Sequence, residues 1–191
     1  MTRILCFAGS ARRGSLNRKL AAVGAEAVRQ AGGEVTLIEL ADFPLPIYLG
    51  DIEAESGIPA GAHELAAIVR AHAGILIASP ENNTSVSALL KNTIDWLSRI
   101  KDAPPFTGKV AGLLAASPGA FGGVRGLYHL RAILNSLGVD VLSMQFVLPR
   151  ANTAFDEEGQ LRDAQQVEQV ARLAARLLDV AARLSEPPGH S

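Results

Sequence analysis

Residues 3–17 read RILCFAGSARRGSLN, and this stretch decides how the chain folds. Its first part, Arg3–Ala8, is a nearly continuous apolar run, as expected for a strand that helices cover on both faces of a parallel sheet. Its second part, Gly9–Asn17, is polar and opens a helix predicted over Leu16–Ala31. The order of strand, loop and helix predicts a βα unit.

The same unit recurs along the chain and predicts an α/β domain with five parallel strands. Further strands are expected at Glu34–Leu40, Gly74–Ser79, Val110–Ser117 and Val139–Val147, and further helices at Ala62–His72, Ser85–Ile100, Val124–Leu137 and Ala164–Leu184. Gly32 and Gly138 stand where helices end in a left-handed C-cap. Residues 42–60 are predicted to be an irregular connection, of the kind that forms lids or contact surfaces. We expect one domain over residues 1–185 and a flexible tail over 186–191.

Composition excludes several classes of function. The 191 residues carry 18 basic and 19 acidic side chains, so no basic surface is expected to bind nucleic acid or an anionic membrane. No apolar run approaches the roughly 18–20 residues of a membrane span, and the start shows no cleavage site of a signal peptide. The single cysteine, Cys6, excludes an internal disulfide and is expected in the core. The four histidines are scattered, so no metal site is predicted, and a cytoplasmic location fits best.

The loop Gly9–Asn17 has the properties of a phosphate site. Backbone N–H groups and the positive end of the helix dipole favour an anion where a helix begins. Ser10, Ser15 and Asn17 can add side-chain hydrogen bonds, and Arg12 can add a charged fork. The alternative is that Ser15 only caps the helix and the arginines are solvated.

Two better-known phosphate loops do not match this segment. In the pattern G-x-x-x-x-G-K-[ST], Ser15 occupies the lysine position and Leu16 the position that would hold Mg²⁺. In the dinucleotide pattern G-x-G-x-x-G, Ala11 replaces the second glycine. What remains is a metal-free cradle for a single phosphate.

Two more loops of unusual composition follow the third and fourth strands. Residues 80–85 read PENNTS, a polar turn whose backbone groups suit the edge of a planar ligand, or an ordinary turn in which Ser85 caps the next helix. Residues 117–125 read SPGAFGGVR, whose glycines allow the backbone to approach a flat ligand, or form a flexible loop. In an open parallel sheet, ligands bind beyond the carboxyl ends of the strands, where all three loops meet.

Together the segments GSARRGSLNRKLA (9–21), SPENNTSVSALLKNTIDW (79–96) and SPGAFGGVR (117–125) resemble the NADPH-dependent FMN reductase family, which includes quinone, chromate and azo-dye reductases. The resemblance extends from the first strand to about Val147. It implies a flavodoxin-like three-layer sandwich with strand order 2-1-3-4-5. It also implies an enzyme that uses FMN and NADPH (or NADH) to reduce small-molecule electron acceptors by ping-pong hydride transfer.

The resemblance also implies the site residues, and no catalytic acid or base is assigned. The FMN phosphate would be held by Ser10, Arg12, Ser15, Leu16 and Asn17, and the ring system would be bordered by Pro80, Glu81, Asn82, Asn83, Thr84, Ser117, Gly119 and Gly122. Many members have tyrosine where this chain has Asn82, and Pro-Gly where it has Ser87-Ala88. We expect FMN binding to persist and acceptor preference to differ.

Members of the family are commonly homodimers or homotetramers. By similarity, the helix with Lys91, Asp95 and Trp96 would lie near a subunit interface, with Arg125 as another contact; for Trp96 the alternative is core packing. Two other functions stay open. One is an electron-carrier flavodoxin, although such carriers are usually strongly acidic; the other is a binding protein that kept the fold and lost the cofactor.

Overall fold

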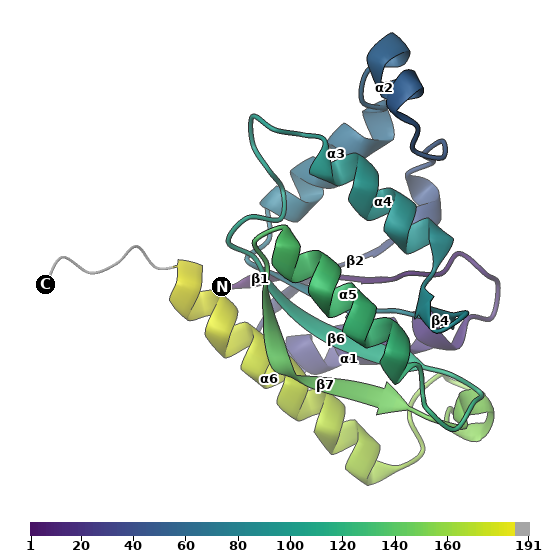
Figure 1. Cartoon of the computed structure of the whole chain (residues 1–191). Coiled ribbons are helices and arrows are strands. Elements are labelled where there is room, and N and C mark those ends of the chain that lie inside the picture. Colours follow the sequence, from purple (N-terminus) through teal and green to yellow (C-terminus); the bar gives the residue numbers. More distant parts are fainter. Residues whose placement is uncertain (186–191) are drawn as a thin grey trace, which may run out of the picture.

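The structure, a computed structural model, describes residues 1–185 and is built on one parallel sheet (Figure 1). The sheet contains β1 (Arg3–Ala8), β2 (Glu34–Glu39), β3 (Gly74–Ala78), β6 (Val110–Ala116) and β7 (Asp140–Leu148), in the order β2-β1-β3-β6-β7. Every neighbouring pair in it is parallel. The α/β flavodoxin-like fold with strand order 2-1-3-4-5 is therefore confirmed. The tail predicted over 186–191 lies outside the described residues.

Helices cover both faces of the sheet, which makes three layers (Figure 1). One face carries α1 (Leu16–Gln30) and α6 (Ala164–Ser185), and the other carries α3 (Ala60–Arg70), α4 (Ala88–Ser98) and α5 (Val124–Ser136). Cys6 lies in the core between the sheet and the α1–α6 layer, fully buried as expected. Burial raises the pKa of its thiol to about 12, so Cys6 is a packing residue.

The connection over residues 42–60 is less irregular than predicted. It follows a short 3₁₀ helix, Leu40–Asp42, and contains α2 (Gly50–Ser56), which projects from the body of the molecule (Figure 1). The segment before α2 is docked on α4, because the Trp96 indole N–H donates to the Pro46 carbonyl at 2.7 Å and the Tyr48 N–H donates to Asn92 Oδ1 at 2.8 Å. No residue of α2 is fully buried, and its sequence, GDIEAES, lacks the apolar periodicity that would predict a helix.

The start of α4 also differs from the prediction. Residues Ser85–Val86 form β5, which pairs with β4 (Glu81–Asn82) as a small antiparallel hairpin. The helix begins at Ala88, and its N-cap is Ser87, whose hydroxyl accepts from the Leu90 N–H at 3.2 Å. The predicted helix start at Ser85 is therefore three residues too early, and the alternative in which Ser85 caps this helix is wrong. The other predicted elements begin and end within two residues of the observed ones, and Gly32 and Gly138 have the left-handed φ values of 90° and 80° expected at C-caps.

Candidate cofactor-binding site

A cavity of about 600 Å³ opens at the carboxyl ends of β1, β3 and β6. Its wall includes these predicted site residues: Ser10, Arg12, Ser15, Leu16, Asn17, Pro80, Glu81, Asn82 and Ser117. It also includes Gly9, Ala11, Ser87, Ala88, Leu89, Ala116 and Pro118, which sequence reasoning did not assign. For Ser87, Ala88 and Leu89 a signal was present in the sequence: a serine directly before an apolar helix is a typical N-cap, and it would have placed the start of α4 at the cavity.

The first loop is held tightly where it leaves the sheet. The Gly9 N–H donates to the Ala78 carbonyl at 2.9 Å, and the Gly9 carbonyl accepts from the Ser87 hydroxyl at 2.6 Å. A side chain at Gly9 would come within 3.0 Å of Leu90 Cδ2, so any larger residue there would require Leu90 to shift. These contacts fix the start of the cradle against a second helix N-terminus.

The start of α1 combines a helix cap with free donors. The Ser15 hydroxyl accepts from the Arg18 N–H at 3.4 Å, as the capping alternative predicts. Among residues 1–185, the backbone N–H groups of Leu16 and Asn17 have no hydrogen-bond partner. Arg12 is exposed at the rim, and the Ser10 hydroxyl accepts from its N–H at 3.4 Å. Unpaired donors and a free guanidinium at a helix N-terminus favour an anion.

The side chain of Asn17, which lines the cavity, also bonds to the protein itself. Its amide nitrogen donates to the Ala116 carbonyl at 2.9 Å, and its amide oxygen accepts from the Ala116 N–H at 2.9 Å. The side chain is buried and joins α1 to the carboxyl end of β6. The side chain therefore braces the fold, and one amide N–H and the backbone N–H of Asn17 are left for a ligand.

Glu81 is also engaged by the protein. Its carboxylate accepts from the backbone N–H groups of Arg125 at 3.0 Å and Gly126 at 3.2 Å, and pairs with the Arg125 guanidinium. Burial opposes ionisation, but the hydrogen bonds from Arg125 and Gly126 outweigh it and hold the pKa of Glu81 below its usual value. Glu81 therefore caps α5, because the N-cap residue Gly123 has no side chain to do so. With its carboxylate engaged, Glu81 has only its backbone left to border a flavin.

The remaining predicted residues do not line the cavity. Asn83 lines a neighbouring cavity of about 690 Å³ outside the hairpin, and Thr84 completes the turn beside it. Gly119 and Gly122 lie in the loop between β6 and α5. Gly122 has φ of 62°, and a side chain there would come within 2.9 Å of the Pro149 nitrogen. Its close approach is thus to the protein's own backbone after β7.

Trp96 lies in the core, which was the alternative to a place near a subunit interface. Its ring is fully buried and meets the Tyr48 ring edge-on, with centroids 5.0 Å apart at 86°. Lys91 pairs with Asp95 within α4 at 2.8 Å.

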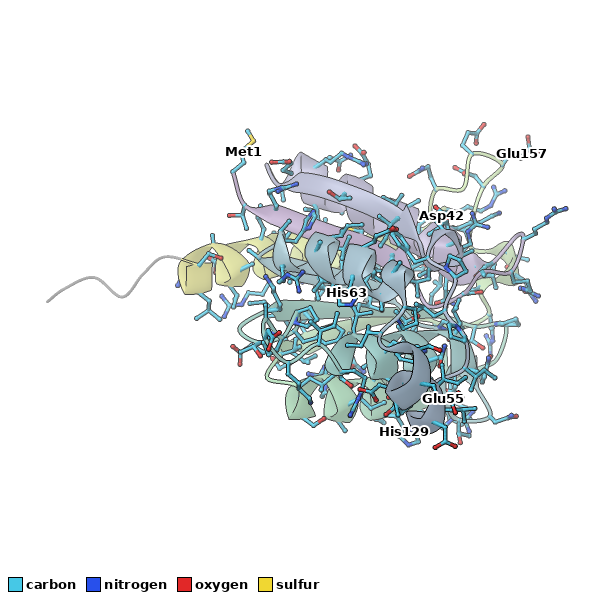
Figure 2. All side chains as sticks on the ribbon, turned by 90° about the horizontal axis from the view of Figure 1, so that it is seen from above. Met1, Asp42, Glu55, His63, His129 and Glu157 are labelled. Carbon is cyan, nitrogen blue, oxygen red and sulfur yellow. The ribbon has the colours of Figure 1, made fainter. Side chains whose placement is uncertain are left out.

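The described residues include no group of three or more His, Cys, Asp or Glu placed to hold a metal ion. Figure 2 shows His63 and His129 well apart. Within residues 1–185, no helix is long and apolar enough to cross a bilayer.

The site fits FMN. A volume of about 600 Å³ lies within the range of roughly 300–1,000 Å³ usual for cofactor pockets. Free backbone donors and Arg12 supply the charge complement of one phosphate, and the backbone of residues 80–82 and 117–118 supplies polar groups at the mouth. No lysine or metal ligand of an NTPase loop lines this cavity.

Comparison with known proteins agrees with this fit. Residues 2–153 match the NADPH-dependent FMN reductase family. An NAD(P)H-dependent FMN reductase of Pseudomonas aeruginosa is 39% identical over 166 residues, 84% of this chain and 85% of the relative. A quinone reductase of Escherichia coli K12 is 39% identical over 142 residues, 74% of this chain and 73% of the relative.

Among solved structures, the flavoenzyme NAD(P)H:(acceptor) oxidoreductase FerB of Paracoccus denitrificans superposes with a TM-score of 0.83. It is 25% identical in sequence, and the alignment covers 96% of this chain and 98% of FerB. Fold, motifs and similarity over most of the chain's length lead to one conclusion: this protein belongs to the NADPH-dependent FMN reductase family.

Proposed function

We propose that this protein is an FMN-dependent NAD(P)H oxidoreductase that reduces quinones or similar small acceptors. The observation that carries the proposal is the cavity at the carboxyl ends of β1, β3 and β6, which the three family motifs enclose. The names of the two bacterial relatives, an FMN reductase and a quinone reductase, support the same activity.

The proposed roles follow from the geometry of the wall. The N–H groups of Leu16 and Asn17, with Ser10, Ser15 and Arg12, would hold the FMN phosphate. Pro80, Glu81 and Asn82 on one side, and Ser117 on the other, would border the ring system through backbone and hydroxyl groups. We propose that four further residues support this wall without lining the cavity: Asn83, Thr84, Gly119 and Gly122.

When bound, FMN supplies the chemistry, since it accepts a hydride from NAD(P)H and returns electrons to an acceptor. The chain's own contribution is orientation. Glu81 is the one carboxylate in the cavity wall, and Arg125 and the start of α5 already bind it. We therefore assign no catalytic acid or base, since a hydride donor and acceptor need to be stacked and oriented more than protonated.

The visible spectrum of the purified protein is the first test. A flavin spectrum, or its appearance after incubation with FMN, is expected; a colourless protein that gains none would refute cofactor binding. Steady NAD(P)H oxidation with a quinone and no partner reductase distinguishes the enzyme from an electron carrier. Parallel double-reciprocal lines are expected if nicotinamide and acceptor use the same open face in turn, whereas intersecting lines would exclude that order.

We further propose that the protein works in the cytoplasm as a homodimer or homotetramer. The exposed side chains of Ile47 and Leu49, beside the segment docked on α4, offer apolar area for a second copy. Light scattering on the purified protein would give the number of subunits, and a monomer at micromolar concentration would contradict the proposal.

A further inference from the structure

The first turns of α5 hold both strands of the β4–β5 hairpin. On β4, the Glu81 carboxylate accepts from two backbone N–H groups of α5 and from Arg125 Nε at 2.9 Å, and only 8% of its side chain is exposed. On β5, the Ser85 hydroxyl lies 2.9 Å from His129 Nδ1. Gly126 allows α5 to lie close to β5, because a side chain at this position would come within 3.1 Å of the Ser85 carbonyl.

The hairpin needs this support, because its turn is strained at Thr84. Asn83 and Thr84 have φ of 48° and 65°; asparagine tolerates this left-handed region, whereas threonine, a β-branched residue, rarely adopts it. Two strands of two residues each cannot stabilise such a turn by themselves. Strained backbone persists where neighbouring structure fixes it, and here that structure is the start of α5.

Arg125 also contacts the loop that forms the opposite wall of the cavity. Its guanidinium carbon lies 5.0 Å from the centre of the Phe121 ring, in the loop that runs from β6 into α5. This loop contains Ser117 and Pro118, which line the cavity. Phe121 is 64% exposed, so few other contacts restrain its position. One side chain thus contacts both segments between which the flavin ring would lie.

We propose that Arg125 is a positioning residue that sets the separation of the two walls of the flavin slot. It does not line the cavity, so it acts through Glu81 and Phe121. Without the guanidinium, the strained hairpin loses its charged partner and the Phe121 loop loses its cation contact. The slot then fits the ring system less well, although the phosphate cradle on the other side is unchanged. The inference rests on the proposed FMN function.

The test is FMN titration of the apoprotein for Arg125→Gln, Arg125→Lys and a matched control, Arg131→Gln. Arg131 lies on the same helix and donates to the carbonyls of Val141 at 3.1 Å and Leu142 at 2.7 Å, away from the cavity. We expect Arg125→Gln to weaken FMN binding by about twofold to thirtyfold, the range for residues that act through others. Arg125→Lys should recover part of this loss, and Arg131→Gln should bind FMN as the wild type does.

Melting temperatures of the apoproteins and the KM for a quinone accompany the titration. Phe121→Leu, an exposed substitution that leaves the ion pair with Glu81 in place, provides a milder variant if Arg125→Gln does not fold. We expect it to weaken FMN binding by about twofold to fivefold.

Wild-type FMN affinity in both Arg125→Gln and Phe121→Leu would overturn the inference and leave the proposed function standing. An equal loss in Arg131→Gln would overturn it too, since the effect would then be general destabilisation. A wild-type protein that binds no FMN would refute the proposed function itself.

Discussion

Replacing Asn17 by alanine measures how much this side chain stabilises the fold. Asn17 lies in the phosphate cradle, but its side chain bonds to β6. Its side chain makes two hydrogen bonds of 2.9 Å to the backbone of Ala116, and both residues are only 4% exposed. Each such bond contributes about 1 kcal/mol net, and a buried group left without a partner costs about 1–3 kcal/mol. Because Ala116 lines the cavity, water can replace part of the loss. We therefore expect Asn17→Ala to lower the free energy of unfolding by about 2–4 kcal/mol, out of roughly 5–15 kcal/mol for a domain.

The assay is urea denaturation of the apoprotein followed by far-ultraviolet circular dichroism. Arg12→Ala is the matched control, since Arg12 lies in the same loop but is exposed. Its unfolding free energy should stay within about 0.5 kcal/mol of the wild type, while its affinity for FMN falls. An Asn17→Ala variant as stable as Arg12→Ala would refute the reasoning, because the bonds to Ala116 would then contribute nothing to the fold.

Three further predictions concern the hairpin, the core and acid stability. Thr84→Gly should raise the free energy of unfolding by about 1 kcal/mol, because glycine adopts the left-handed conformation without the steric cost; an unchanged urea midpoint would contradict this. Cys6 should react with a thiol reagent only after unfolding, because it is buried and its pKa is raised to about 12; rapid labelling of the folded protein would disprove its place in the core. The folded-state pKa of Glu81 is depressed, so its stabilising contribution is present above the ordinary carboxyl value of 4.5 and is lost as the pH falls through the folded-state pKa. The difference in urea midpoint between wild type and Glu81→Gln should therefore shrink in acid, and a difference that grows would reverse the argument.

The sequence alone determined the architecture and the position of the site. Short apolar runs such as ILCFA and GILIA are typical of strands buried on both faces, and their alternation with helical segments predicts a parallel sheet. The carboxyl ends of such strands meet at one edge, so the loops at residues 9–17, 80–85 and 117–125 were expected to meet there, and residues from all three line the cavity. These features depend on local pattern and chain order, both of which can be read along the sequence.

Only the tertiary structure decided what individual side chains do at that edge. An asparagine or glutamate near a phosphate loop has the same local sequence whether it faces a ligand or the protein. Asn17 turns to β6 and Glu81 to α5 because backbone groups far away in the chain, those of the buried Ala116 and those at the start of α5, need partners. The identity of these partners depends on contacts between segments 99 and 44 residues apart, and no local pattern contains that information.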